Sequence, residues 1–445
     1  MSAPPAAPPP GSSDTSESAG RQPWWIPPFL GRVPPEITER QIRLVGVVAL
    51  ALAFEYYDLS MLGAALKDIR ESFGLPQSEG GRLTALVRLG ALPAIFLVLL
   101  ADRIGRRRLF LGCIVGTSLA TLLTAFTQTA YQFVAIQMVA RVFLIGGSAT
   151  AFVIVSEELP AAHRGWAIGI LGALGSLGFG LGALVFAAID WLPYGWRTLY
   201  VLGIAPLLLL PMFRREVSET QRFRDHQAAV EAAPGAVVAW WQPFWTMLRL
   251  YPGRTLAIAL VGLFSAGAHA PAHQLLGDYV RTDHGWEPFE YSAMFICGGL
   301  LGIIGNTTAG RLADRLGRRV IGFLVLALFP LFALGFYQGS GWVLPLMWIP
   351  LVFTSTGGNT IIRAVSTELF PTSARGTATG SLSFFETVGA ALGLLVVTLL
   401  TPVGESSASV ISGVVFIALL GAVIMLMLPE TARRELEDLA HESRS

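Results

Sequence analysis

Residues 100–107, LADRIGRR, recur with a single change as residues 312–319, LADRLGRR. A second motif, E-x-x-P-x-x-x-R-G, begins at Glu157 and begins again at Glu368. The separation is 212 residues for the first pair (312 − 100) and 211 residues for the second (368 − 157). A near-constant offset over this distance predicts two homologous halves, and repeats of this size in an apolar chain are typical of two-half membrane transporters.

Two smaller features share this offset: a Glu-Thr pair that begins at Glu219 and again at Glu430, and a row of glycines. Small residues at helical spacing let membrane helices approach closely, so we expect these glycines to have a structural role. The glycines are Gly165, Gly169, Gly178 and Gly182 in the first half, and Gly376, Gly380, Gly389 and Gly393 in the second.

The composition places most of this chain in a lipid bilayer. Of its 445 residues, 53% are hydrophobic and 14% are charged, whereas soluble domains carry about 25% charged residues. The sequence predicts an all-α membrane protein with about twelve transmembrane helices, each near the roughly 20 residues that cross a bilayer, in two homologous six-helix halves. The expected spans are residues 42–66, 82–101, 108–127, 131–154, 165–189, 196–212, 254–280, 290–311, 319–338, 342–364, 375–400 and 407–428.

Charge and composition also predict how the chain is divided and oriented. Basic clusters fall on one side of the alternating spans, and the positive-inside tendency places that side and both termini in the cytoplasm of a cell-membrane protein. The segment over residues 240–248, which is rich in aromatic residues, predicts either an interfacial helix or a loosely docked linker. The expected segments are a disordered N-terminal tail over 1–38, the first half over 39–213, a cytoplasmic connector over 214–253, the second half over 254–429 and a C-terminal tail over 430–445.

The repeated A-D-R-x-G-R-R loops resemble the signature loop of the major facilitator superfamily. The paired E-x-x-P-x-x-x-R-G segments and the ending Pro429-Glu430-Thr431 resemble its sugar-porter and metabolite:proton symporter branches. Sugar porters usually carry Gln-Gln followed by Gly and Asn at the seventh span, whereas this chain reads HQLLGD over residues 273–278, which counts against a hexose carrier. The resemblance implies a secondary transporter and not an enzyme.

The resemblance also implies that the signature loops clamp the two halves together at their cytoplasmic ends. The expected gate residues are Asp102, Arg106, Asp314 and Arg318, joined by Glu157, Arg164, Glu368 and Arg375. The alternative is that these arginines only enforce the topology.

Ionisable residues inside the spans are functional candidates, because a charge at membrane depth costs roughly 3 kcal/mol or more. Glu55 and Asp58 are three residues apart and share a helix face. Asp58 resembles the proton-accepting Asp of proton-coupled sugar porters, and Arg141 resembles its partner; Glu55 is the reserve candidate. A carboxyl that alternates between apolar and arginine-paired surroundings would switch between proton uptake and release. The alternative is a static buried ion pair.

A second set of residues is expected at the substrate cavity. His269 and His273 lie one helical turn apart, and subtracting 58 from 269 gives 211, so His269 is the repeat counterpart of Asp58. Such histidines contact an anionic substrate, relay a proton or only pack. Arg88 either attracts an anion or extends to the headgroups, and Glu386 either lines the cavity or bonds a neighbouring helix. Gln274, Trp348 and Asn359 complete the expected cavity residues.

These residues favour proton-coupled uptake of a small organic acid or related metabolite. A proton-antiport exporter, a sugar symporter and a transporter-like nutrient receptor are the alternatives. The expected partners are a small-molecule substrate, protons and the bilayer, with no nucleic acid, and the protein is expected to act as a monomer. Cys113 and Cys297 lie inside apolar runs, so neither a disulfide nor a metal site is indicated, and no cofactor is expected.

Overall fold

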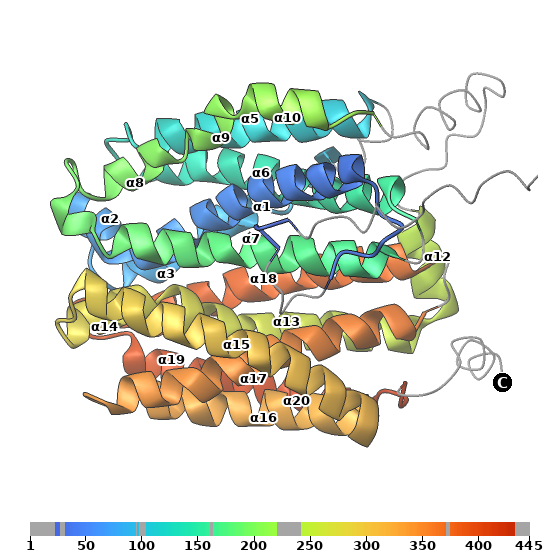
Figure 1. Ribbon diagram of the computed structural model, residues 1–445. Helices are drawn as coiled ribbons and strands as arrows, with labels where there is room; N and C mark the ends of the chain where they lie inside the picture. The colour runs from blue at the N-terminus through green and yellow to red at the C-terminus, as the bar shows by residue number, and fades with distance from the viewer. Residues whose placement is uncertain are drawn as a thin grey trace, which may run out of the picture.

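The regular secondary structure of the described residues is entirely helical. Figure 1 shows two packed groups of helices, the first coloured blue to green and the second yellow to red. The computed structural model describes residues 23–26, 32–94, 96–97, 104–160, 163–219, 242–370 and 374–431, without the side chains of residues 242–243 and 303–307.

The first group contains α1 (Glu39–Ala64), α2 (Leu66–Ser72), α3 (Glu79–Leu89), α5 (Arg106–Thr124), α6 (Ala130–Glu158), α7 (Arg164–Phe186), α8 (Trp196–Leu202), α9 (Ala205–Leu208) and α10 (Leu210–Glu216). The second group contains α12 (Gln242–Leu250), α13 (Pro252–Gln274), α14 (Leu276–Asp283), α15 (Pro288–Leu316), α16 (Arg318–Tyr337), α17 (Val343–Glu368), α18 (Arg375–Leu400), α19 (Ala408–Val414) and α20 (Ala418–Met427).

Within the described residues, 9 helical segments are long and apolar enough to cross a membrane. The other three expected spans coincide with α3, of which the described part is short, and with the long helices α15 and α17. The second half of α17 carries several polar residues, including Thr354, Ser355 and Asn359. The result is consistent with the predicted arrangement of about twelve membrane helices in two halves.

Prolines break two of the expected spans. Pro206 and Pro211 stand in the first turns of α9 and α10, where the missing N–H costs no helical hydrogen bond. Pro271 lies inside α13, which ends three residues later at Gln274. The chain then re-forms a helix as α14, and this short helix packs against α1 and α2 of the other group.

The described part of the expected N-terminal tail packs on the bundle. Ile26 is 1% exposed and belongs to the core around α1. The ring of Trp25 packs against Gly46 of α1, where an added Cβ would lie 2.8 Å from the ring. Apolar side chains here contribute buried area that the Pro- and Ser-rich composition did not indicate. Of the expected tails and connector, three segments lie outside the described residues: the rest of the N-terminal tail, the part of the connector over residues 220–241, and the C-terminal residues 432–445.

The connector ends in a helix, α12, rather than in an irregular linker. Met247 is 2% exposed and packs into the core of the second group, while Phe244 and Trp245 are 37% and 50% exposed. This arrangement has the form expected of an interfacial helix, with one buried anchor and exposed aromatic rings.

Half of the repeated glycines mark close helix crossings. A Cβ on Gly178 would lie 1.9 Å from the backbone oxygen of Ala53, and a Cβ on Gly389 would lie 2.1 Å from that of Leu263. The repeat therefore places equivalent crossings in both groups, between α1 and α7 and between α13 and α18. Only glycine permits backbones to approach this closely.

We expect Gly178→Val and Gly389→Val to destabilise the protein by about 3 kcal/mol, the upper end for overpacking, because the obstacle is backbone. Gly180→Val and Gly380→Val are matched controls, since a Cβ at either position meets nothing within 4 Å. Thermal melting of the detergent-purified variants measures the difference. Equal melting temperatures for the variants and their controls would contradict the assignment of these crossings.

The two groups meet at one end of the bundle. This end, called distal here, carries α2, α14 and the loops at 187–195 and 338–342; at the proximal end α1 begins and α20 ends (Figure 1). Distal contacts between the groups include the rings of Phe186 and Tyr291, 5.6 Å apart, and Gly81 against the backbone of Leu394. Near the proximal end, the ion pairs of the gate residues join elements of the same group.

Candidate functional site

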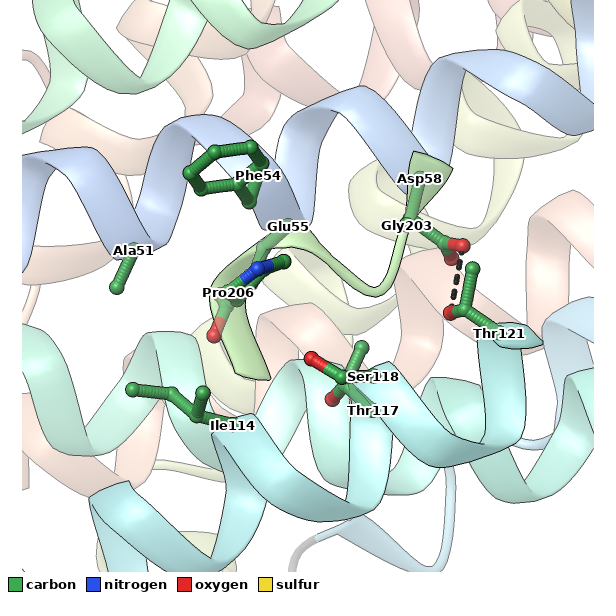
Figure 2. Close-up of a pocket in the computed structure, with 10 residues that line it drawn as sticks. All are labelled: Ala51, Phe54, Glu55, Asp58, Ile114, Thr117, Ser118, Thr121, Gly203 and Pro206. Atoms are coloured by element: carbon green, nitrogen blue, oxygen red, sulfur yellow. Dashed lines mark hydrogen bonds between the residues drawn. The ribbon is translucent and has the colours of Figure 1, made fainter. Parts of the chain in front are cut away.

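Glu55 and Asp58 are buried on one face of α1, at 5% and 4% exposure. Thr121 donates a hydrogen bond of 2.9 Å to Asp58, and Ser148 donates one to Glu55. Figure 2 shows both carboxyls at a pocket between α1, α5 and the α8–α9 segment. The residues that line this pocket are Ala51, Phe54, Glu55, Asp58, Ile114, Thr117, Ser118, Thr121, Gly203 and Pro206.

Arg141 enters this region from α6, as its expected pairing with Asp58 requires. It is 9% exposed, and its charge acts on Asp58 and on the hydroxyl of Tyr200. Thr121 on α5 bonds Asp58 directly, whereas Arg141 on α6 acts on it through its charge. A carboxyl with one hydroxyl donor and one nearby guanidinium has the partners needed to hold either the charged or the protonated form.

A second arginine, Arg88, links Arg141 electrostatically to the second group. Arg88 on α3 interacts with Arg141 on one side and with Glu386 of α18 on the other. The buried Nε of Arg88 makes no hydrogen bond with the described residues. Arg88 therefore faces the protein interior, toward the second group, and not the headgroups.

Arg363 completes this series, and the sequence analysis missed it. Its Nη2 lies 2.9 Å from Oε2 of Glu386, and its charge also reaches the Tyr56 ring on α1 of the other group. Arg363 stands at the proximal end of its span, where an arginine is expected only to orient the helix in the membrane. Its spacing of four residues from Asn359 places both on one helix face and could have revealed it. We call Asp58, Arg141, Arg88, Glu386 and Arg363 the charge relay.

The two histidines lie in an aromatic cluster of the second group. The ring of His269 is 4.1 Å from that of Phe329, and His273 is 5.6 Å from Trp348. Nδ1 of His273 lies 3.0 Å from the backbone oxygen of His269, and its Nε2 lies 3.2 Å from Oγ of Ser355. A neutral imidazole that donates from Nδ1 and accepts at Nε2 satisfies both contacts.

The other expected cavity residues lie at different depths. Trp348 is 2% exposed and packs with the histidines, so it borders no open space in this conformation. The backbone of Gln274 lies 3.6 Å from where a Cβ on Gly63 would be, in the distal contact between the groups. Asn359 is exposed on the same face of α17 as Arg363.

The expected gate residues form equivalent ion pairs inside each group. Arg106 lies 3.5 Å from Glu157, and Arg318 lies 2.8 Å from Glu368 and 3.2 Å from Asp314. These pairs join the signature loop of each group to the end of α6 or α17.

Three gate residues remain. Arg164 donates to the backbone oxygen of Leu159 at 3.3 Å, and Arg375 interacts with Glu368. Asp102 lies outside the described residues.

The repeated Glu-Thr pair has a role that the sequence analysis did not assign. Glu430 accepts hydrogen bonds from the backbone N–H groups of Arg318 and Arg319, at 2.8 and 3.2 Å. Glu219 accepts from Arg107 at 3.2 Å in the equivalent place. A carboxylate there satisfies free N–H groups at a helix start and complements the helix dipole. Gly317, at φ +104, leaves room for it, because a Cβ there would lie 2.6 Å from Glu430.

Four charges, three of them buried and one (Asp68) partly exposed, join the two groups at the distal end, and the sequence analysis missed them as well. Nε of Arg70 lies 2.8 Å from Oδ1 of Asp278, and Arg281 pairs with Asp68. Subtracting 70 from 281 gives 211, so the two arginines are repeat counterparts, and each binds an aspartate of the other group. We call these four residues the distal latch. The repeat offset was the signal that could have found it.

No cluster of three or more potential metal ligands occurs among the residues that the structure describes.

Comparison with known proteins agrees with this architecture. The sequence profile of the Major Facilitator Superfamily matches residues 48–279 and, separately, residues 258–444. A cis,cis-muconate transport protein of Acinetobacter baylyi is 27% identical over 77% of this chain and 83% of its own length. A putative niacin/nicotinamide transporter, NiaP, of Bacillus subtilis is 25% identical over 89% of this chain and 98% of its own.

Among solved structures, the xylose transporter XylE of E. coli in an inward open conformation shares the fold, with a TM-score of 0.73. The two chains are 17% identical, and the match covers 90% of this chain and 99% of XylE. Because one profile matches both halves of a fold that a solved transporter shares, this chain belongs to the Major Facilitator Superfamily, and it is a multi-pass membrane transporter and not an enzyme.

Proposed function

We propose that this protein imports a small organic acid together with protons by alternating access. The observation that carries the proposal is the charge relay, which runs from Asp58 in the first group to Arg363 in the second. Three of its five members are arginines, so the relay holds one more positive charge than negative. An anionic substrate would balance this excess at the interface that must open and close.

The proton site and the substrate site would then be separate but electrically connected. Asp58 holds the proton within the first group, and the substrate binds between the groups near Arg88 and Arg363. Loss or gain of a charge at Asp58 changes the field at Arg141 and, through it, at Arg88. Two ligands coupled in this way influence each other's affinity reciprocally.

The relatives support the choice of substrate class. Cis,cis-muconate and niacin, named for two of them, are small carboxylic acids or their close derivatives. Mostly apolar surroundings with a few charges at fixed positions are also typical of sites for small organic ligands.

The proximal end would face the cytoplasm, in a cell membrane. Basic residues Arg106, Arg107 and Arg108 stand at that end of α5, and Arg318 and Arg319 at that end of α16, as the positive-inside tendency requires. Contacts between the groups gather at the distal end, so the described conformation corresponds to a state open toward the cytoplasm.

Reconstitution into liposomes tests this function. Uptake of labelled nicotinate, benzoate, cis,cis-muconate and xylose is followed with and without an inward proton gradient. We expect at least one carboxylate to accumulate above its external concentration only with the gradient, and xylose to be excluded. Accumulation without a gradient, or of xylose alone, would overturn the proposal, and accumulation driven by an outward gradient would identify an exporter.

A further inference from the structure

The Arg363–Glu386 pair is unusual in its exposure. The side chain of Arg363 is 52% exposed, whereas that of Glu386 is 14% exposed, and the two are joined by a bond of 2.9 Å. Both belong to the second group, but their charges also act on Tyr56 and Arg88 of the first. The pair therefore lies within electrostatic reach of the first group, and half of the Arg363 side chain is exposed near the proximal end of α17.

The carboxylate of Glu386 interacts with two guanidinium groups, one from each group of helices. Arg363 bonds it directly, and Arg88, whose buried Nε has no hydrogen-bond partner among the described residues, acts on it from α3. A substrate carboxylate has the same charge, shape and acceptor atoms as the Glu386 side chain. Guanidinium groups bind such carboxylates through two parallel hydrogen bonds.

We propose that Arg363 is the residue that binds the substrate carboxylate, and that Glu386 occupies Arg363 in its place when the transporter is empty. This inference rests on the proposed function. Arg363 exchanges one carboxylate for another, so it is never left without a charge partner near the membrane interior. Asn359, exposed one turn away on the same face of α17, is placed to contact the rest of the substrate.

The exchange has a chemical consequence that a purely structural ion pair lacks. Removing the Glu386 charge removes the competitor and leaves Arg363 and Arg88 for the ligand, so carboxylate affinity rises. Removing the Arg363 charge removes the ligand's partner, so carboxylate affinity falls. The two substitutions therefore act in opposite directions, whereas breaking a structural pair from either side would have the same effect.

Equilibrium binding to the purified full-length transporter tests the inference. The probes are nicotinate, benzoate and cis,cis-muconate, with nicotinamide and benzamide as uncharged counterparts. We expect Arg363→Gln to weaken carboxylate binding about 10- to 100-fold, the range for a hydrogen bond to a charged group. Amide binding should change less than about threefold, and Arg363→Lys should retain part of the carboxylate affinity.

Glu386→Gln is the opposing variant, and we expect it to tighten carboxylate binding severalfold. Arg249→Gln is the matched control, because Arg249 is an exposed arginine that packs on Trp245 of α12, outside the interface. Melting temperatures establish that each variant is folded.

The outcomes separate this inference from the function on which it rests. If the unmodified protein binds none of the carboxylates, the proposed function fails, and the inference fails with it. If the protein binds carboxylates but Arg363→Gln leaves that affinity unchanged, only the inference fails. Equal losses for Arg363→Gln and Glu386→Gln, with carboxylates and amides affected alike, would also overturn it and indicate a structural pair.

Discussion

Asp58→Asn is expected to abolish proton-driven accumulation of substrate while preserving exchange of substrate across the membrane. Asn resembles the protonated carboxyl in shape and charge and still accepts the hydrogen bond from Thr121, which is 2.9 Å from Asp58. It cannot release a proton, so the transport cycle loses its link to the gradient. The buried position keeps water from substituting for the missing group.

Two assays on the same liposomes measure this effect. Uphill uptake under an inward proton gradient should fall to the passive level, whereas counterflow of labelled against unlabelled substrate should continue at a reduced rate. Glu55→Gln is the matched control, because Glu55 is an equally buried acid one turn away that accepts from Ser148. If Glu55→Gln abolishes accumulation and Asp58→Asn does not, Glu55 is the proton site. If neither does, α1 does not carry the coupling.

The repeat made most of the architecture predictable. Two copies of one loop motif, separated by a near-constant offset, predicted the two halves. The structure places equivalent ion pairs of Arg106 and Arg318 inside the two groups, whereas the expected clamp would join the groups. The glycine rows predicted close packing, but only Gly178, Gly182 and their counterparts lie at a crossing. Which face of a helix meets its neighbour depends on rotation about the helix axis, and apolar helices in lipid leave that rotation unmarked.

The sequence singled out candidate site residues only where a charge stood deep within a span. A charge at that depth has a high free-energy cost, so Asp58 and Arg141 stand out in the sequence as functional candidates. Arg363 stands near the end of α17 and extends inward to Glu386, so its position in the sequence conceals its role. The same holds for Arg70, since α2 begins at Leu66, the expected end of the first span, and Arg70 lies beyond it. Long side chains bring charge to places that backbone position does not indicate.

Breaking the distal latch is expected to shift the protein from the distally closed to the distally open state. Arg70 and Asp278 have side-chain exposures of 6% and 3%. While the groups are closed, Asp278→Asn leaves the buried guanidinium with only the half-exposed Glu71, at 3.7 Å, as a charged partner. Removing one member of a buried pair costs about 3–5 kcal/mol. Since opening returns Arg70 to water, a change of about 3 kcal/mol would alter the closed-to-open ratio by roughly 100-fold.

Spin labels at Tyr194 and Trp342 report this change, because both are exposed at the distal end, at 86% and 88%, and belong to different groups. Cys113 and Cys297 are first replaced by serine, so that only the two introduced cysteines carry labels. We expect Asp278→Asn to move the label distance distribution to longer values. Exchange of the second pair, Asp68→Arg with Arg281→Asp, should retain the unmodified distribution better than either single change.

Glu79→Gln controls for the loss of a charge as such at the same end. Its carboxylate pairs with Arg82 at 2.8 Å, but Arg82 is half-exposed and the pair lies within α3 without joining the two groups, so its removal should leave the distances unchanged. A latch that only fixes the local fold would give the opposite pattern, in which Asp278→Asn lowers the melting temperature without a longer distance. A longer distance in Asp278→Asn alone identifies the four charges as the contact that must open in each transport cycle, because their buried pairs exist in only one of the two states.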